Sequence, residues 1–221
     1  MFSDRRQAGR DLAEAVVRSA GQLSGSLVLG IPRGGVVVAD EVARRLGAEL
    51  DITVPRKLRA PANPELAIGA VAEDGGVLVD ERTVAALRVD PDYLAQETEY
   101  QMAEIERRRR AYRGDRPAPT LTGRTVVVVD DGIATGSTML AALRSIRARG
   151  AGRVIAAIPV APPEGVRRLS QEGFEVVCVH TDPMFMAVGQ FYADFSQVTD
   201  EEVRAILRAA WERERSRSDV H

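Results

Sequence analysis

The chain has 221 residues, of which 45% are hydrophobic and 28% charged, a composition that suits one buried core beneath a polar surface. Its formal net charge of −2 provides no general positive field, so nucleic acid is not an expected partner. The single cysteine, Cys178, favours a reducing cytoplasm, and the sequence suggests neither a secretory signal nor a membrane span.

Helices and short apolar strands alternate in the first part of the chain. Apolar spacing predicts a helix over 3–21, a strand over 26–31 and a helix over 36–46. A second strand is expected at 50–56, as in the βα units of a parallel sheet. A loop rich in proline and charge is expected at 57–66.

The middle of the chain combines a hairpin with a long charged helix. Strands at 67–72 and 76–79 are expected to pair around the turn at 73–75. A charged helix is expected from Asp90 to about 113, followed by a linker. Because this helix also carries several glutamates, its run Arg107–Arg110 is interpreted as part of a solvated face of mixed charge.

Residues 126–138 read VVVVDDGIATGST and form the most informative segment. The four valines predict a strand that is buried on both faces. Two carboxylates end this strand, and a loop of small and hydroxyl residues follows. From Ser137 onward, apolar residues recur at the spacing of one helix face.

This strand, loop and helix are suited to bind a sugar phosphate. The N–H groups at the helix start and the hydroxyls of Thr135, Ser137 and Thr138 can bind a dianionic phosphate. Asp130 and Asp131 can accept hydrogen bonds from vicinal hydroxyls of the sugar. The alternative is an ordinary polar turn, which needs neither paired carboxylates nor three hydroxyls.

Further strands are expected at 153–160 and 175–180, with a helix between them, and Thr199 begins a last helix with a capping box. The alternation predicts an α/β fold with a doubly wound parallel sheet that binds its ligand at the carboxyl ends of the strands. We expect one domain at 1–213, with a core at about 24–180, a helical insertion at about 81–115 and a C-terminal hood at 181–213. A disordered polar tail is expected after it, at 214–221.

Residues 126–138 resemble the signature of the type I phosphoribosyltransferases, which has several apolar residues, two acidic residues and a small-residue loop with Thr-Gly and Ser or Thr. The resemblance implies the fold of that family with a small hood. It also implies transfer of 5-phosphoribose from 5-phosphoribosyl 1-pyrophosphate (PRPP) to a nucleobase or related nitrogen heterocycle, with release of pyrophosphate, as in nucleotide salvage. A homodimer is expected from the same resemblance.

The resemblance assigns residues to the parts of PRPP. Those implied for the 5′-phosphate are Ala134, Thr135, Gly136, Ser137 and Thr138. Mg²⁺ is expected to be held mainly through PRPP, with Asp130 and Asp131 as further ligands. These two aspartates would also orient the ribose and favour the positive charge that develops on it.

A second loop, Gly30-Ile31-Pro32-Arg33-Gly34-Gly35, again joins a strand to a helix. Glycines allow close backbone approach and an arginine suits phosphate oxygens, but no lysine follows as in a Walker A loop. The resemblance assigns pyrophosphate binding to Pro32, Arg33, Gly34, Gly35, Arg56 and Lys57. It gives Arg33 and Lys57 a catalytic role beside the two aspartates.

The acceptor is left open by the sequence. Phe185 or Met186 could stack on a base, although core packing explains their apolar segment equally well. Ala134 stands where 6-oxopurine enzymes usually have an aspartate, and the usual lysine after the next strand is absent. The loop is therefore closer to the adenine type, without establishing adenine.

Two roles and one alternative function also stay open. Glu65 and His180 could transfer protons, but a solvated loop carboxylate and a structural histidine explain them as well. The alternative function is a regulatory module that senses PRPP and contacts nucleic acid. The Arg107–Arg110 run favours it, whereas the net charge opposes it.

Overall fold

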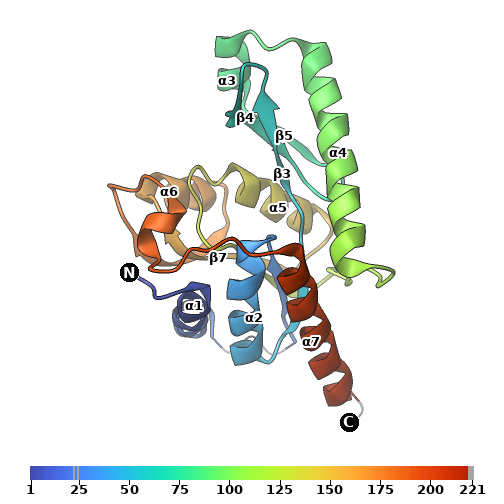
Figure 1. The fold of residues 1–221 in the computed structure, drawn as a ribbon, viewed down its shortest axis with the longest axis vertical. Helices are drawn as coiled ribbons and strands as arrows, with labels where there is room; N and C mark the ends of the chain where they lie inside the picture. The colour runs from blue at the N-terminus through green and yellow to red at the C-terminus, as the bar shows by residue number, and fades with distance from the viewer. Residues whose placement is uncertain (22, 24, 219–221) are drawn as a thin grey trace.

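The computed structural model describes residues 1–21, 23 and 25–218, which form a lower core and an upper lobe (Figure 1). The core contains a five-stranded sheet in the order β2-β1-β6-β7-β8. Every neighbouring pair in this sheet is parallel. Its strands are β1 (Leu27–Gly30), β2 (Glu49–Ile52), β6 (Thr125–Val129), β7 (Arg153–Ala161) and β8 (Glu175–Thr181). The predicted doubly wound α/β fold is confirmed.

Helices cover both faces of the sheet (Figure 1). On one side lie α1 (Arg5–Ala20), α2 (Gly34–Leu46) and α7 (Asp200–Ser218), and on the other α5 (Ser137–Ala148) and α6 (Pro163–Gln171). The valines of β6 alternate between these layers. Val127 and Val129 join the cluster of α1 and α2, whereas Val126 and Val128 join the cluster of α5. This alternation explains why the strand has no polar face.

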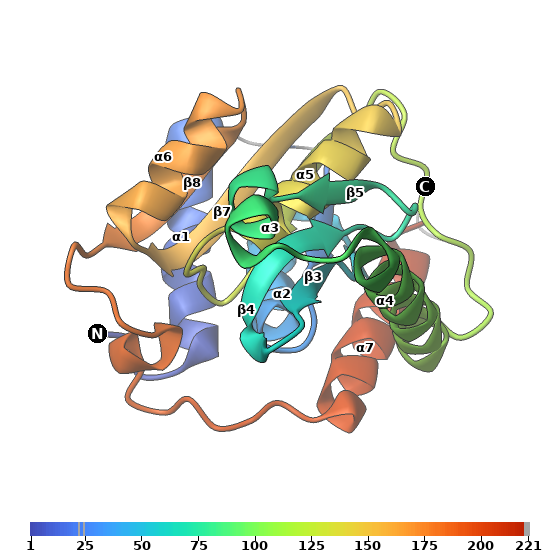
Figure 2. The ribbon, with the colours of Figure 1, turned by 90° about the horizontal axis from the view of Figure 1, so that it is seen from above.

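The upper lobe is inserted between β2 and β6. It contains an antiparallel sheet of β3 (Arg56–Ala60), β4 (Asn63–Val71) and β5 (Val77–Val79), with α3 (Glu81–Leu87) and α4 (Pro91–Arg113). Viewed from above, α3 lies over the strands and α4 runs along their side (Figure 2). The helical insertion expected at 81–115 is thus the second half of a larger mixed lobe.

The loop expected at 57–66 is a β-hairpin, so this prediction is wrong. Lys57 pairs with Ala70 and Leu58 with Gly69. Leu58 and Ile68 are fully buried in the lobe, which gives both strands an apolar inner face. The strand expected at 50–56 is correspondingly two strands, interrupted at 53–55 before the hairpin begins.

The C-terminal segment runs through a short 3₁₀ helix, η1 (Val188–Phe191), to α7. The predicted capping box is confirmed: the Thr199 N–H donates to Glu202 Oε2 (2.7 Å), and the Glu202 N–H donates to Thr199 Oγ1 (3.1 Å). The helix continues to Ser218, past the start of the expected tail at 214, because Arg213 and Glu214 pair with Asp40 and Arg116. The end of that tail, 219–221, lies outside the described residues.

Candidate functional site

Two loops meet at the carboxyl end of the central strands. Strands β1 and β6 are neighbours, with Gly30 opposite Val129. The chain leaves β1 toward α2 on one face and leaves β6 toward α5 on the other. Such a reversal opens a crevice in a parallel sheet, where ligands of doubly wound proteins bind. Both loops singled out in the sequence therefore border one site.

A cleft of about 530 Å³ lies at this crevice. The predicted residues that line it are Pro32, Arg33, Gly34, Arg56, Lys57, Asp130, Asp131 and Thr138. Its other lining residues are Arg5, Ile31, Pro55, Phe195, Gln197 and Val198. The structure thus brings together side chains from the core loops, the upper-lobe hairpin and the C-terminal segment.

The loop after β1 packs directly on the acidic pair. A Cβ atom added to Gly34 would fall 1.9 Å from Asp131 Oδ2, and one added to Gly35 would fall 2.9 Å from the Asp130 Cα. Glycine is therefore required at both positions for this close approach. The peptide bond between Pro32 and Arg33 is cis.

The two carboxylates differ in their surroundings. Asp131 Oδ2 accepts a hydrogen bond from Arg5 Nε (2.7 Å), and the Asp131 carbonyl accepts one from the Tyr192 hydroxyl (2.5 Å). Asp130 Oδ1 accepts the Asp131 N–H (2.9 Å). Burial, followed by the Asp131 charge, raises the pKa of Asp130 well above its usual range. The Asp130 carboxyl therefore keeps its proton to a higher pH than an ordinary aspartate does.

Arg5 is a site residue that the sequence did not suggest. It begins α1, and its guanidinium donates to the Ser196 carbonyl (2.8 Å) and lies 3.9 Å from the centre of the Phe195 ring. It thereby fastens the C-terminal segment to Asp131. No local pattern signals this role, because the contact joins positions 126 residues apart.

The loop after β6, residues 132–138, leads into the first turn of α5 and is called the phosphate-type loop. Gly136 has φ 74°, and α5 begins at Ser137. The Thr135 and Ser137 hydroxyl oxygens are 3.2 Å apart, and the Ser137 N–H points to Thr135 Oγ1 at 3.4 Å. Ala134 and Thr135 are exposed, so an anion can reach this loop. A second unpredicted residue, Arg168 of α6, contacts the same loop through Ser137 Oγ (3.0 Å).

The cations of the cleft come from both lobes. Arg33 Nη1 lies 3.8 Å from Asp200 Oδ1 at the start of α7. Arg56 Nε donates to Gln101 Oε1 (3.0 Å), and burial together with nearby Arg108 lowers the pKa of Arg56. Lys57 follows on the same strand and lines the cleft. Strand β3 thus brings positive charge to the cleft from the upper lobe.

The arginine run at 107–110 of α4 agrees only in part with the solvated face of mixed charge that the sequence predicts. Arg107 pairs with Glu104, and Arg109 and Arg110 both pair with Glu106. Arg108 has no hydrogen bond or ion pair among the described residues, and its Nε atom is buried. Three of the four arginines fit the expectation, whereas Arg108 is partly buried and its charge lies near Arg56.

Three of the residues suggested for base stacking and proton transfer do not line this cleft, namely Phe185, Met186 and His180. Phe185 stacks on Phe191 with ring centres 5.4 Å apart, and Met186 is 88% exposed. His180 is about half exposed and lies 3.9 Å from Asp182. The side chain of Glu65 lies outside the described residues. Phe195 is the aromatic residue that borders the cleft, and it is absent from the sequence-based candidates.

The site has few ligands for a metal. Within the described ranges, no group of three or more histidine, cysteine, aspartate or glutamate side chains could hold an ion. Asp130 and Asp131 offer only a pair of carboxylates. This donor set fits Mg²⁺, which typically binds one or two carboxylates and completes its shell with water and substrate phosphates.

The family follows from comparison with known proteins. The sequence model described as the phosphoribosyl transferase domain matches residues 3–196, and the chain belongs to this family. This membership confirms the resemblance found at residues 126–138.

The relatives agree with this assignment. A candidate phosphoribosyl transferase of Mycobacterium tuberculosis is 44% identical over 210 residues, a match that covers 95% of this chain and 47% of the relative. The chain therefore spans about half the length of such curated relatives. An adenine phosphoribosyltransferase of Marinobacter nauticus is 41% identical over 85 residues, which are 38% of this chain and 43% of that protein.

A solved structure confirms the fold. The crystal structure of the protein TT1426 from Thermus thermophilus is 49% identical, with a TM-score of 0.79 over 94% of this chain and 97% of that one. In the part of the chain that the structure describes, no helix combines the length and apolarity needed to span a membrane.

Proposed function

We propose that this protein transfers 5-phosphoribose from PRPP to a nitrogen base and releases pyrophosphate in a Mg²⁺-dependent reaction. One observation carries the proposal: Asp130 and Asp131 share a cleft with Arg33 and Lys57, and the hydroxyl loop that starts α5 adjoins them. A carboxylate pair for a diol, flanked by two anion sites, matches the three parts of PRPP.

The geometry suggests an orientation for the donor. The 5′-phosphate would bind residues 134–138, the ribose hydroxyls Asp130 and Asp131, and the pyrophosphate the loop at 32–35 with Arg56 and Lys57. The bond from the anomeric carbon to the pyrophosphate oxygen breaks, and a bond to the acceptor nitrogen forms. The proton on that nitrogen passes to solvent or to a basic group.

Charge develops in opposite directions during this substitution. The aspartates would stabilise positive charge on the ribose, and Arg33 and Lys57 would stabilise negative charge on the departing pyrophosphate. Mg²⁺, held by Asp130 and Asp131 together with the diphosphate, would supply further neutralisation of the leaving group. Removing one such electrostatic contact typically costs about 3 kcal/mol of transition-state stabilisation, or roughly a hundredfold in rate.

The acceptor is proposed only as a class, a nucleobase or a related heterocycle. Ala134 and the lack of a lysine at 160–163 argue against 6-oxopurines. The partial match to an adenine enzyme agrees with an adenine-type loop but covers a minority of the chain. Arg107, Arg109 and Arg110 pair with glutamates of the same helix, which weakens the support for a nucleic-acid-contacting sensor.

The direct test is pyrophosphate release from PRPP and Mg²⁺ with a panel of heterocycles. We expect turnover with at least one base, and a loss of about a hundredfold or more in Asp130→Asn and Asp131→Asn. Asp11→Asn is the matched control, because Asp11 is an exposed aspartate on α1 outside the cleft. Absence of turnover combined with absence of PRPP binding in calorimetry would overturn the proposal.

Two further expectations belong with this function. We propose a cytoplasmic location, supported by the lone thiol of Cys178, whose pKa burial raises to about 11. We also propose a homodimer, which sedimentation equilibrium of the purified protein tests directly.

A further inference from the structure

The phosphate-type loop has an unbalanced electrostatic environment. Residues 132–138 contain no lysine or arginine, and two carboxylates immediately precede them. The start of α5 supplies only about half a positive charge, whereas a phosphate monoester carries nearly two negative charges at neutral pH. A dianion bound there would therefore need a cation from elsewhere in the fold.

Arg168 of α6 is placed to supply that cation. Its Nη1 donates to Ser137 Oγ (3.0 Å) and to the Thr135 carbonyl (3.3 Å). Gly165, one turn earlier on the same helix, makes this approach possible, because a Cβ atom there would lie 3.3 Å from the Ala134 carbonyl oxygen. Helix α6 thus packs on the loop with Arg168 directed at the Ser137 hydroxyl and the Thr135 carbonyl.

The remaining donors of Arg168 are available on the same side. Both of its hydrogen bonds come from Nη1, and among the described residues Nη2 and Nε make none. Asp80, the N-cap of α3, is near enough for the charge of Arg168 to act on it. Hydrogen bonds from Thr83 and, more weakly, the Arg168 charge lower the pKa of Asp80. The guanidinium is therefore bordered by the phosphate-type loop and by the upper lobe.

We propose that Arg168 binds the 5′-phosphate of the donor and selects phosphorylated over unphosphorylated ribose. The inference rests on the proposed function and adds a residue from outside the family signature. A fork of N–H donors suits phosphate oxygens, and a charge-assisted hydrogen bond of this kind is worth about tenfold to a hundredfold in affinity.

The experiment compares two neighbouring arginines in the full chain. Arg168→Gln removes the proposed contact, and Arg167→Gln is the matched control because Arg167 is 61% exposed and faces Glu164 at 3.6 Å. Calorimetry measures Kd for ribose 5-phosphate, for Mg²⁺ pyrophosphate and for PRPP. We expect Arg168→Gln to weaken the binding of ribose 5-phosphate about tenfold or more and to leave the binding of pyrophosphate unchanged. The control Arg167→Gln should bind all three ligands as the wild type does. Arg168→Lys, which keeps the charge, should recover part of the affinity.

Other outcomes separate the two proposals. If Arg168→Gln binds ribose 5-phosphate and pyrophosphate equally more weakly, or binds both as the wild type does, the role of Arg168 is overturned. Binding of PRPP by the wild type would in that case still uphold the proposed function. Failure of the wild type to bind PRPP overturns both. A pH series adds an independent readout: phosphate takes up a proton below about pH 6, so the advantage of wild type over Arg168→Gln should shrink there. A purely structural role of Arg168 would not produce that change.

Discussion

Asp130 and Asp131 are adjacent in sequence but stand in different electrostatic environments. Asp131 is paired with Arg5 at 2.7 Å, whereas burial and the neighbouring carboxylate raise the pKa of Asp130 well above its usual range. A ligand that donates hydroxyls or brings a cation favours the ionised form of Asp130. If the proposed donor binds here, its binding would therefore be coupled to the loss of a proton.

We predict that PRPP with Mg²⁺ releases protons on binding at a pH below the raised pKa of Asp130. Affinity should accordingly increase as the pH rises through that pKa. Calorimetry in buffers of different ionisation enthalpy measures the release. Asp130→Asn should abolish the part of the proton release that comes from Asp130. The release that remains in this variant measures the protons that PRPP itself loses. Net proton uptake by the wild type, or equal release by the variant, would contradict the prediction.

At the scale of residues, the sequence allowed a prediction for the thirteen consecutive positions 126–138, whose ligand-binding groups lie on one short segment. The carboxylates and hydroxyls at 130–138 are close in space because they are close in sequence. Arg5 and Arg168 are different, since each reaches the site only through helix packing. An arginine at the start of a helix or on its surface has no local signature that tells whether it faces a ligand or solvent.

The hairpin of β3 and β4 shows the same limit for whole elements. Proline at 61 and 64 and several charges made the segment resemble a loop. Its apolar residues Leu58 and Ile68 become a shared face only when the strands pair and Ile105 of α4 packs nearby. In contrast, the capping box of α7 was predictable because both partners lie within one turn.

Helix α4 allows a test of the role that a single unpaired charge has in stability. Arg108→Met keeps an apolar stem but removes a buried unpartnered Nε and a cation near Arg56. We predict that it raises the free energy of unfolding by about 1 kcal/mol. Urea denaturation measures the change. The control is Arg109→Met, which loses an exposed pair with Glu106 and should cost about 0–1 kcal/mol. A larger loss in Arg108→Met than in Arg109→Met would refute this reasoning.

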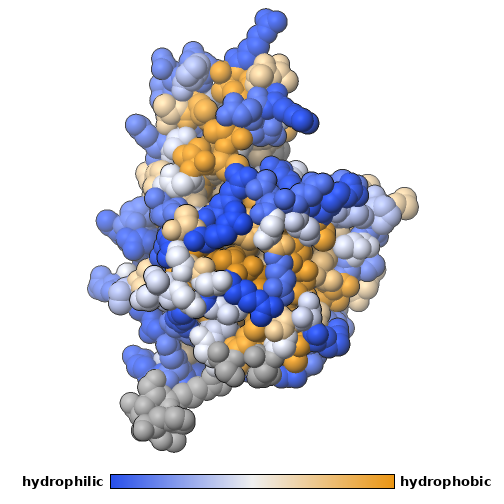
Figure 3. Space-filling view, turned by 180° about the vertical axis from the view of Figure 1, so that it is seen from behind, coloured by the Kyte–Doolittle hydropathy of each residue, from blue (hydrophilic) through white to orange (hydrophobic). Residues whose placement is uncertain are grey.

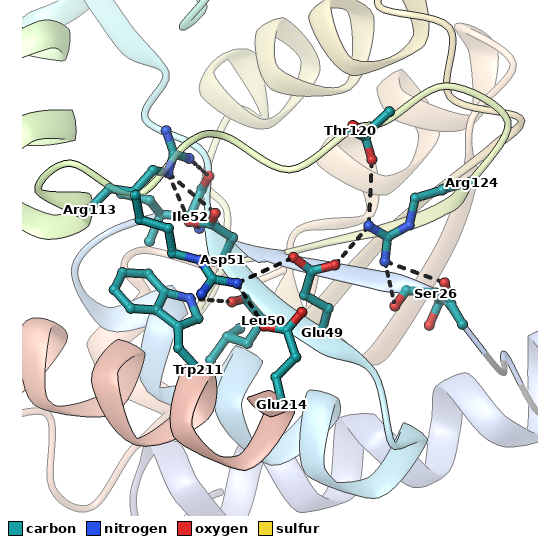
Figure 4. Close-up of polar contacts among 12 residues, drawn as sticks. Ser26, Glu49, Leu50, Asp51, Ile52, Arg113, Thr120, Arg124, Trp211 and Glu214 are labelled. Atoms are coloured by element: carbon teal, nitrogen blue, oxygen red, sulfur yellow. Dashed lines mark hydrogen bonds and ion pairs between the residues drawn. The ribbon is translucent and has the colours of Figure 1, made fainter. Parts of the chain in front are cut away.

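For the whole molecule, the junction of the two lobes is a buried ionic cluster (Figure 4). Arg113, the last residue of α4, donates to Asp51 Oδ1 (3.1 Å), to Glu73 Oε1 (2.9 Å) and to the Ile52 carbonyl (3.0 Å). The side chains of Arg113 and Asp51 are only 2% and 1% exposed. Burial raises the pKa of Asp51, although the Arg113 charge opposes this shift. The cluster joins β2, the turn after β4 and the end of α4.

Removing the cation from this cluster should destabilise the fold strongly. We predict that Arg113→Met lowers the free energy of unfolding by about 3–5 kcal/mol at neutral pH, because two buried carboxylates lose their partner. Since the folded-state pKa of Asp51 is raised, the loss of unfolding free energy in Arg113→Met should grow as the pH rises through that pKa and should shrink at lower pH. Thermal unfolding over a pH series measures this. Arg116→Met, which loses the more exposed pair with Glu214, should cost about 1 kcal/mol or less. Equal effects of the two variants would show that the cluster does not fasten the lobes.

The topology of the core was predictable because alternating strands and helices allow few arrangements. The extent of the upper lobe was not, since its boundary depends on Arg113 folding back to β2, a contact across 62 positions. The face of the molecule drawn in Figure 3 gives a similar lesson: hydrophobic residues appear on both lobes, among many hydrophilic ones, without marking the boundary between the lobes.

The chain leaves the core after Ile52 and returns at Arg113, whose guanidinium bonds to the Ile52 carbonyl. Both crossings therefore occur at one corner of the parallel sheet. A recombination event that exchanged residues 56–113 for a foreign segment with similarly spaced ends would leave every sheet pairing of the core in place. A grafted lobe would still have to supply the cleft cations at 56 and 57 and the arginine at 113 that bonds to Asp51. Diversification above the crevice is therefore compatible with the core sheet only where these contacts are kept.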